Sequence, residues 1–180
     1  MKASIAIDMD NVIADLDLQC VRWYYRKYGK QLKKEDLYDN GHIEKEAYNF
    51  LLTPGFFSDI PVMAGAQNAI LEIMKSFEVY IVSAAMEFPQ SMPEKLAWLK
   101  THFPFISWKQ IIFCGVKKLI ATDYMIDDYA KNLDFFNGKG IMFAAGHNSG
   151  DKRKNKVYNW DEALAYLKSE SLSTNNNSRP

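Results

Sequence analysis

Short, continuous apolar runs recur along the chain, and polar or turn-forming residues follow each of them. The runs are Ser4–Ile7, Val79–Val82, Ile111–Cys114, Tyr124–Ile126 and Ile141–Ala144. Because the apolar residues are consecutive rather than alternating, the pattern is typical of strands that are buried on both faces of a parallel sheet.

Helical patterns separate several of these runs. Apolar residues recur at helical spacing across residues 66–77 and again across residues 91–103. Ser91 and Glu94 have the spacing of a capping box at the start of the second helix. The same spacing predicts that one side of that helix carries Leu96, Leu99 and Phe103.

A last helix is indicated near the end of the chain. Asn159 and Glu162 have the spacing of a helix start, and we expect the helix to end at about Lys168. Strands that alternate with helices predict an α/β fold with a Rossmann-like parallel sheet flanked by helices.

One segment interrupts the alternation, because about 70 residues separate the first two strands and a single crossover helix needs far fewer. We expect helices from Asp15 to Tyr28, ended by Gly29, and from Ile43 to Leu52. These features predict a small helical cap inserted after the first strand, at residues 15–61. The alternative is a set of helices packed on the core without a role. The segment is rich in aromatic residues: Trp23, Tyr24, Tyr25, Tyr28, Tyr38, Tyr48, Phe50, Phe56 and Phe57.

The remaining boundaries follow from this division. Residues 1–14 and 62–168 are predicted to form the α/β core. Residues 169–180 are polar and without periodicity, so we expect a disordered tail there.

Composition narrows the functional classes. Apolar residues make up 48% of the 180 residues, which excludes a wholly disordered chain, and Lys+Arg equals Asp+Glu at 22 each. This balance gives no reason to expect a nucleic acid polymer or an anionic membrane as partner. Cys20 and Cys114 have no metal-ligand spacing, so we expect two buried thiols in a reducing compartment. The first apolar stretch is too short for a signal peptide, which predicts a cytoplasmic protein.

Chemistry-bearing residues follow the predicted strands. Asp8 and Asp10 come after the first strand, Ser83 ends the second, Lys117 and Lys118 follow the third, and Asp127 and Asp128 end the fourth. The carboxyl ends of parallel strands meet at one edge of a sheet, where ligands bind. These side chains are therefore expected to lie together.

Four carboxylates at one edge would repel one another strongly in a partly desolvated cleft. A divalent cation removes the conflict, and hard oxygen ligands without nearby His or Cys favour Mg²⁺, which also binds substrate phosphates. The sequence therefore predicts Mg²⁺ as cofactor. We interpret His42, His102 and His147 as surface or loop residues away from the acids.

These motifs resemble those of the haloacid dehalogenase superfamily. The segment from Asp8 to Ile13 resembles its first motif, Ser83 its second, Lys117 its third and the pair Asp127-Asp128 its fourth. Within the superfamily, the chain is most similar to the 5'(3')-deoxyribonucleotidases. The similarity rests on residues 8–15, 55–57, 63–66 and 123–128 and on the position of Lys117 ten residues before Asp127.

The resemblance implies roles for these residues. Asp8 would be the nucleophile that forms an aspartyl-phosphate, and Asp10 the general acid and base. The metal would be bound by the side chains of Asp8 and Asp128 and by the backbone carbonyl of Asp10. Asp127 would orient a metal-bound water or Lys117. Lys117 would hold Asp8 and the phosphate, with Lys118 as the alternative. The substrate phosphate would also accept hydrogen bonds from the Ser83 hydroxyl and the Ala84 amide.

The implied activity is a Mg²⁺-dependent phosphomonoesterase acting on a small phosphate ester, in this family a (deoxy)nucleoside monophosphate. The first alternative is a phosphatase of the same superfamily that acts on a non-nucleotide ester. The second is a phospho-aspartate receiver domain. The order of the acidic residues and the inserted cap both argue against it. Tyr129 stands where the family commonly has a charged residue. Because Leu16 replaces an aromatic residue found in pyrimidine-selective members, we expect weaker discrimination among bases than those members show.

Overall fold

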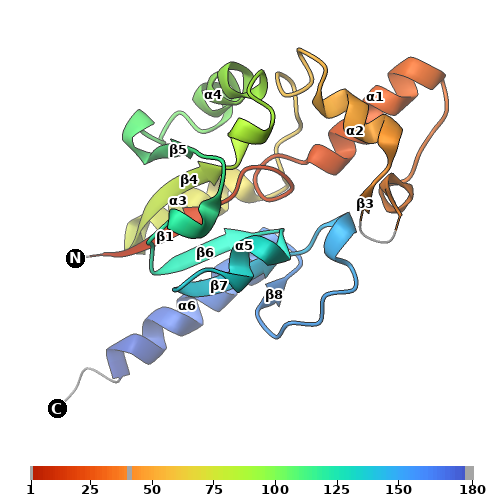
Figure 1. Ribbon diagram of the computed structural model, residues 1–180. Coiled ribbons are helices and arrows are strands. Elements are labelled where there is room, and N and C mark those ends of the chain that lie inside the picture. The colour runs from red at the N-terminus through yellow and green to blue at the C-terminus, as the bar shows by residue number, and fades with distance from the viewer. Residues whose placement is uncertain (1, 40–41, 177–180) are drawn as a thin grey trace.

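The computed structural model describes residues 2–39 and 42–176, and a central parallel sheet organises them (Figure 1). In the described residues the sheet has six strands in the order β5-β4-β1-β6-β7-β8, and every neighbouring pair is parallel. The strands are β1 (Ala3–Ile7), β4 (Phe77–Ser83), β5 (Ile111–Phe113), β6 (Tyr124–Asp127), β7 (Lys139–Phe143) and β8 (Lys156–Val157). The predicted α/β fold with a Rossmann-like sheet is confirmed.

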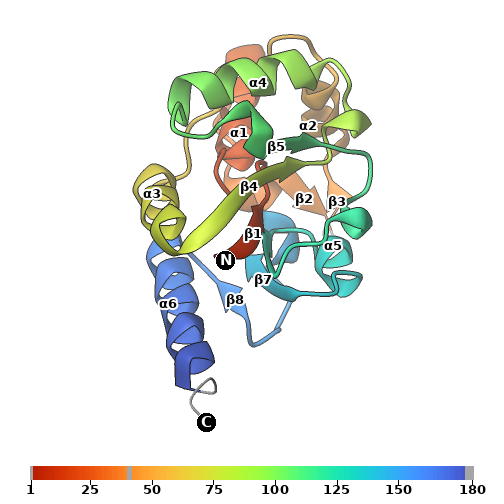
Figure 2. The same ribbon diagram turned by 90° about the vertical axis from the view of Figure 1, so that its left-hand side faces the viewer.

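Helices cover both faces of this sheet. Alternate residues of each strand point to opposite faces, so Ile5 and Ile7 join a large apolar core while Ala6 joins a smaller one. In Figure 2, α3 and α6 lie on one side of the sheet and α5 lies on the other. The α-helices are α1 (Leu16–Tyr28), α2 (Lys45–Leu51), α3 (Ala66–Ser76), α4 (Ser91–His102), α5 (Ala130–Asp134) and α6 (Trp160–Asn176).

Residues 15–61, which the sequence predicts to form the cap, follow β1. Asp15 caps α1 by accepting a hydrogen bond from the Leu18 amide, and Gly29 ends that helix at φ 66°, as the sequence predicts. The cap also contains a short hairpin of β2 (Tyr38–Asp39) and β3 (His42–Ile43). Figure 1 shows α1, α2 and β3 grouped beyond one end of the sheet.

The chain leaves the core and returns to it at adjacent points. The Asp15 amide donates to the Pro61 carbonyl at 2.8 Å, and the Met63 amide donates to the Ile13 carbonyl at 2.8 Å. Ala14 and Val62 form an antiparallel bridge between the two crossings. The domain boundaries that the sequence predicts here stay predictions.

Several element limits differ from the sequence analysis. Helix α6 continues to Asn176, so the predicted tail overlaps it, because no Gly or Pro interrupts residues 169–176. The rest of the predicted tail, residues 177–180, lies outside the described residues. Ile43 belongs to β3, and α2 starts only at Lys45. Strands β3 and β8 are two residues long, too short for an apolar pattern to reveal.

The predicted capping box of α4 is wrong. Instead of capping its own helix, the Glu94 carboxylate accepts hydrogen bonds from the Gly55 amide at 2.6 Å and the Phe57 amide at 2.9 Å. Leu96, expected on the buried side with Leu99 and Phe103, is 41% exposed. Lys95 instead lies on the buried side of α4. Glu94 thus ties α4 to the end of the cap.

No helix in the described part of the chain combines the length and apolar character needed to cross a membrane.

Candidate active site

A tight turn after β1 places the first two carboxylates. The Met9 carbonyl accepts hydrogen bonds from the Ile13 and Ala14 amides, which folds the chain back directly after Asp8. Asn11 has φ 54°, a left-handed conformation that Asn tolerates better than most residues. Its side chain accepts a hydrogen bond from the Asp17 amide at 3.0 Å, which couples this turn to the first turn of α1.

A buried lysine bridges the nucleophile candidate, Asp8, and the end of β6. The Lys117 ammonium pairs with Asp8 and, at 2.7 Å, with Asp127, and only 2% of the Lys117 side chain is exposed. Burial disfavours the ammonium, but the two carboxylates outweigh it and raise the pKa of Lys117 above its usual value. Lys118 is exposed. Of the two lysines left open by the sequence, Lys117 is therefore the one in contact with the acids.

Three buried carboxylates converge beside that lysine. Oxygen atoms of Asp8, Asp127 and Asp128 all lie within 4.8 Å of one another. Burial, opposed by Lys117 and assisted by repulsion from Asp127 and Asp10, raises the pKa of Asp8 to about 7. Burial and the charges of Asp8 and Asp127 likewise raise the pKa of Asp128 well above its usual value. A divalent cation bound to these hard oxygen atoms would relieve the repulsion, so the donor set fits Mg²⁺.

Asp127 is held by three hydrogen bonds, from Tyr129 and Asn132, and by an ion pair with Lys117 at the base of this cluster. One carboxylate oxygen accepts from the Tyr129 amide at 2.8 Å, and Asn132 donates to both oxygens at 3.0 and 3.1 Å. The other oxygen pairs with Lys117 at 2.7 Å. These contacts orient Asp127 toward Lys117 and fix it against movement.

A second buried lysine, which the sequence analysis missed, contacts Asp10. Lys95 on α4 donates to Asp10 Oδ2 at 2.5 Å and to Ser83 Oγ at 3.0 Å. Ser83 is itself fully buried and does not line the cavity described below, whereas Ala84 does. In the described conformation the Ser83 hydroxyl therefore contacts Lys95. The sequence signal for Lys95 is its spacing from Ser91, Trp98 and Leu99, which share the buried side of α4.

His147 lies at the site, so its interpretation as a surface or loop residue away from the acids is wrong. Its Nε2 is 2.9 Å from the Asp128 backbone carbonyl and 3.7 Å from the Asp128 carboxylate. Burial lowers the pKa of His147 below its usual value. Its ring packs between Tyr38 of the cap and Tyr129 of the core. Spacing along the chain gave no signal because the turn that carries His147 follows β7, one strand beyond the last motif.

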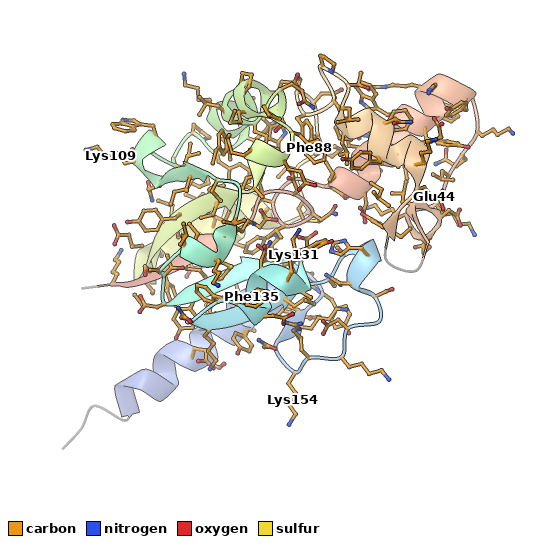
Figure 3. All side chains as sticks on the ribbon, viewed as in Figure 1. Glu44, Phe88, Lys109, Lys131, Phe135 and Lys154 are labelled. Carbon is orange, nitrogen blue, oxygen red and sulfur yellow. The ribbon has the colours of Figure 1, made fainter. Side chains whose placement is uncertain are left out.

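A cavity of about 660 Å³ opens between the carboxylates and the cap. Figure 3 shows Phe88 on the cap side of this region, and Lys131 and Phe135 on the opposite side, from α5 and its end. The polar groups at its base are Asp8, Asp10, Asn11, Lys117 and Asp128, and apolar or aromatic groups on the cap side are Leu16, Tyr38, Ile43, Tyr48, Leu51 and Phe88.

The aromatic residues of the cap divide into two sets. Trp23 packs against Phe50 at 5.9 Å and Phe56 at 5.2 Å between ring centroids, which makes it part of the core of the cap. Tyr38 and Tyr48 line the cavity instead. Leu16 and Tyr129, the two departures from the family pattern, line the cavity as well.

The family model and the similar proteins agree in describing nucleotidases. The family described as 5' nucleotidase, deoxy (pyrimidine), cytosolic type C protein matches residues 2–170. A 5'(3')-deoxyribonucleotidase of Bacillus subtilis is 39% identical over 168 residues, which cover 90% of this chain and 96% of that protein. A 5'(3')-deoxyribonucleotidase of Bacillus phage SPbeta matches with the same identity and coverage.

Solved structures support the fold. A haloacid dehalogenase-like hydrolase of Streptococcus pneumoniae has a TM-score of 0.62 at 11% identity, covering 92% of this chain and 98% of that one. A HAD-hydrolase of Bacillus subtilis described as bound to magnesium has a TM-score of 0.53 at 12% identity, with the same coverage. At such low identity the likeness concerns the fold alone.

Proposed function

Because the chain belongs to the 5' nucleotidase, deoxy (pyrimidine), cytosolic type C family and is a phosphoric monoester hydrolase, we propose that it dephosphorylates (deoxy)nucleoside monophosphates through an aspartyl-phosphate on Asp8. The observation that carries the proposal is the position of Asp8. It lies at the carboxyl end of β1, paired with Lys117, at the base of a cavity whose cap side is apolar and aromatic. A phosphate fits the polar base, and a nucleoside fits the cap side.

In the first step, Asp8 attacks phosphorus in line with the ester oxygen. A bond forms between an Asp8 carboxylate oxygen and phosphorus, and the bond from phosphorus to the ester oxygen breaks. Asp10 gives its proton to the departing oxygen, so the nucleoside leaves as an alcohol. The Lys117 ammonium offsets the negative charge that the phosphate brings to Asp8 and Asp127.

In the second step, water attacks the phosphorus of the aspartyl-phosphate. Asp10, now a carboxylate, takes a proton from that water, and the bond between phosphorus and Asp8 breaks. Inorganic phosphate leaves, and both carboxyl groups return to their starting state. Ala84 lines the cavity, and its amide is assigned to donate a hydrogen bond to a phosphate oxygen.

Mg²⁺ completes the proposed site. The ion would be held by the side chains of Asp8 and Asp128 and by the backbone carbonyl of Asp10. Asp127 would support this arrangement through its contact with Lys117. When bound, the ion neutralises carboxylate and phosphate charge. Burial, together with repulsion among the carboxylates, raises the pKa values of Asp8 and Asp128, and this supports the assignment.

Selection among esters is assigned to the cap, because the base of the site meets the same phosphate in each ester. Stacking of a nucleobase on an aromatic side chain contributes about 1–3 kcal/mol. The test is kcat/KM for dUMP, dTMP, dGMP, UMP and a sugar phosphate. We expect every nucleotide to exceed the sugar phosphate, deoxyribose to be preferred, and the bases to differ little because Leu16 replaces an aromatic residue. A sugar phosphate that equals or exceeds all nucleotides would refute the nucleotidase assignment.

A cap variant makes that test specific. Tyr48→Ala removes an aromatic ring from the cavity, so kcat/KM for nucleotides should fall about tenfold while that for the sugar phosphate stays unchanged. Tyr25→Ala is the matched control, because Tyr25 is 55% exposed on α1 and does not line the cavity. Equal losses in both variants would argue against stacking on Tyr48.

A further inference from the structure

Lys95 is a buried cation beside the reacting groups. Only 1% of its side chain is exposed, and its ammonium is 2.5 Å from Asp10 Oδ2 and 3.0 Å from Ser83 Oγ. The ring of Phe57 lies on another side, with its centroid 4.8 Å away. The ammonium therefore contacts a carboxylate, a hydroxyl and an aromatic face.

Burying an ammonium is costly unless it is paired and hydrogen-bonded. Within residues 2–39 and 42–176, Asp10 is the one carboxylate that pairs with Lys95. Lys95 does not line the cavity, so it is not placed to touch a substrate there. Any effect of Lys95 on the reaction must therefore pass through Asp10 or Ser83.

The two carboxylate oxygens of Asp10 have different surroundings. Oδ2 accepts the hydrogen bond from Lys95. Oδ1 is buried and has no hydrogen-bond partner among the residues that the structure describes, although Asp10 lines the cavity. Lys95 thereby occupies Oδ2, and Oδ1 is the oxygen of Asp10 that is left without a hydrogen-bond partner at the cavity.

We propose that Lys95 is a positioning residue that holds Asp10 for proton transfer. The inference rests on the proposed function. With Oδ2 accepting from Lys95, the transferable proton resides on Oδ1. When the bond from phosphorus to the ester oxygen breaks, that proton passes to the ester oxygen, and the ammonium stabilises the carboxylate left behind. In the second step Oδ1 takes a proton from the attacking water.

The hydroxyl of Ser83 is ordered by the same ammonium. An ammonium only donates hydrogen bonds, so Ser83 Oγ accepts from Lys95. The hydroxyl hydrogen of Ser83 is therefore left for a different acceptor. A bound phosphate would be such an acceptor, and its contact with Ser83 would be the same for every ester.

A change of leaving group separates the effect of Lys95 through Asp10 from any effect through Ser83. p-Nitrophenolate departs without a proton, whereas the alkoxide of a nucleoside needs one. In Lys95→Met, we expect kcat/KM for dUMP to fall at least about tenfold more than kcat/KM for p-nitrophenyl phosphate. The parameter kcat/KM reports the steps up to departure of the first product, which here is the alcohol or phenol. Any loss through Ser83 should appear equally with both esters.

A purely structural role would give a different result. Misfolding lowers the amount of active enzyme and reduces both activities by one factor, so the ratio of the two activities would stay at the wild-type value. Lys100→Met is the matched control, because Lys100 is exposed on the same helix, and it should change neither activity. If Lys95→Met does not fold, Lys95→Gln removes the charge while keeping a hydrogen-bond donor, and the same change in the ratio is expected.

A double variant tests the path through Asp10. Asp10→Ala should raise the ratio of aryl to alkyl activity by itself, and adding Lys95→Met should then change that ratio by less than about threefold. An unchanged ratio in both Lys95 variants, or full additivity with Asp10→Ala, would overturn the proposal.

The wild-type enzyme tests the proposed function separately. If it hydrolyses another alkyl ester at least as well as every nucleotide, the nucleotidase assignment fails and Lys95 is tested with that ester. If it hydrolyses none, both proposals are refuted.

Discussion

Two buried lysines reach the proposed site from different elements and differ in the groups they contact. Lys117, after β5, lies between the two carboxylates Asp8 and Asp127. Lys95, on α4, lies between one carboxylate, Asp10, and one hydroxyl, Ser83. Both side chains are almost fully buried, at 2% and 1% exposure. The difference is therefore in the partners rather than in burial.

The partners indicate two separate tasks. Lys117 contacts the group proposed to bond to phosphorus, so its charge bears on every ester alike. Lys95 contacts the group proposed to move the proton, so its influence depends on whether the leaving oxygen needs one. Charge neutralisation and proton positioning are thus assigned to different cations.

The largest effect is expected at Asp8 itself. Asp8→Asn keeps the shape of the side chain but removes the attacking charge, so turnover of both aryl and alkyl phosphates should fall at least ~10³-fold. Circular dichroism and the melting temperature should show an intact fold, because the variant also removes one of three mutually repelling carboxylates. Substantial turnover by a pure, folded sample would exclude Asp8 as the nucleophile.

Lys117→Met sharpens the contrast with Lys95. Removal of this ammonium should lower kcat/KM by about 10²–10³-fold, and by the same factor for p-nitrophenyl phosphate and dUMP. Lys118→Met is the control for the neighbouring lysine that the sequence left as an alternative, and its loss should be much smaller. A strong dependence of the Lys117 effect on the leaving group would remove the distinction between the two lysines.

The carboxylates beside Lys117 predict a dependence on a divalent cation. EDTA should abolish activity and Mg²⁺ should restore it, and Asp128→Ala should raise the Mg²⁺ concentration for half-maximal activity about 10–100-fold. Asp123→Ala is the control at the other end of β6, where Asp123 accepts hydrogen bonds from Ser4 and lies far along the strand from the cluster. Full activity without metal, or an unchanged Mg²⁺ titration in Asp128→Ala, would contradict this prediction.

Much of the fold and one side of the site could be predicted from the sequence. Strands such as Val79–Val82 are buried on both faces, so their consecutive apolar residues were a direct signal. Lys117 was found because a lysine ten residues before Asp127 matches a family motif, and the structure pairs these two residues. Both features depend on residues that are close together in the sequence.

The other side of the site depends on contacts across the fold. Lys95 meets Asp10 across 85 residues of sequence, and helical spacing alone suggested Leu96 for the buried face of α4. Glu94 was expected to cap its own helix, but it binds cap amides at Gly55 and Phe57. Lys95 was therefore not singled out and Glu94 was assigned to its own helix, because the partner of each belongs to a distant segment.

The paired crossings between Ile13 and Met63 have a consequence for how such a protein can diversify. The departing and returning chains are hydrogen-bonded to each other, so the intervening segment is inserted at what is, for the core, a single point. Closing that point with a different segment would cost little chain entropy, because the ends are already adjacent. Segments of other length or sequence can therefore be exchanged there while the register of β1 with β4 and β6 is kept. The architecture allows the chemistry at the sheet edge and the choice of leaving group to evolve separately.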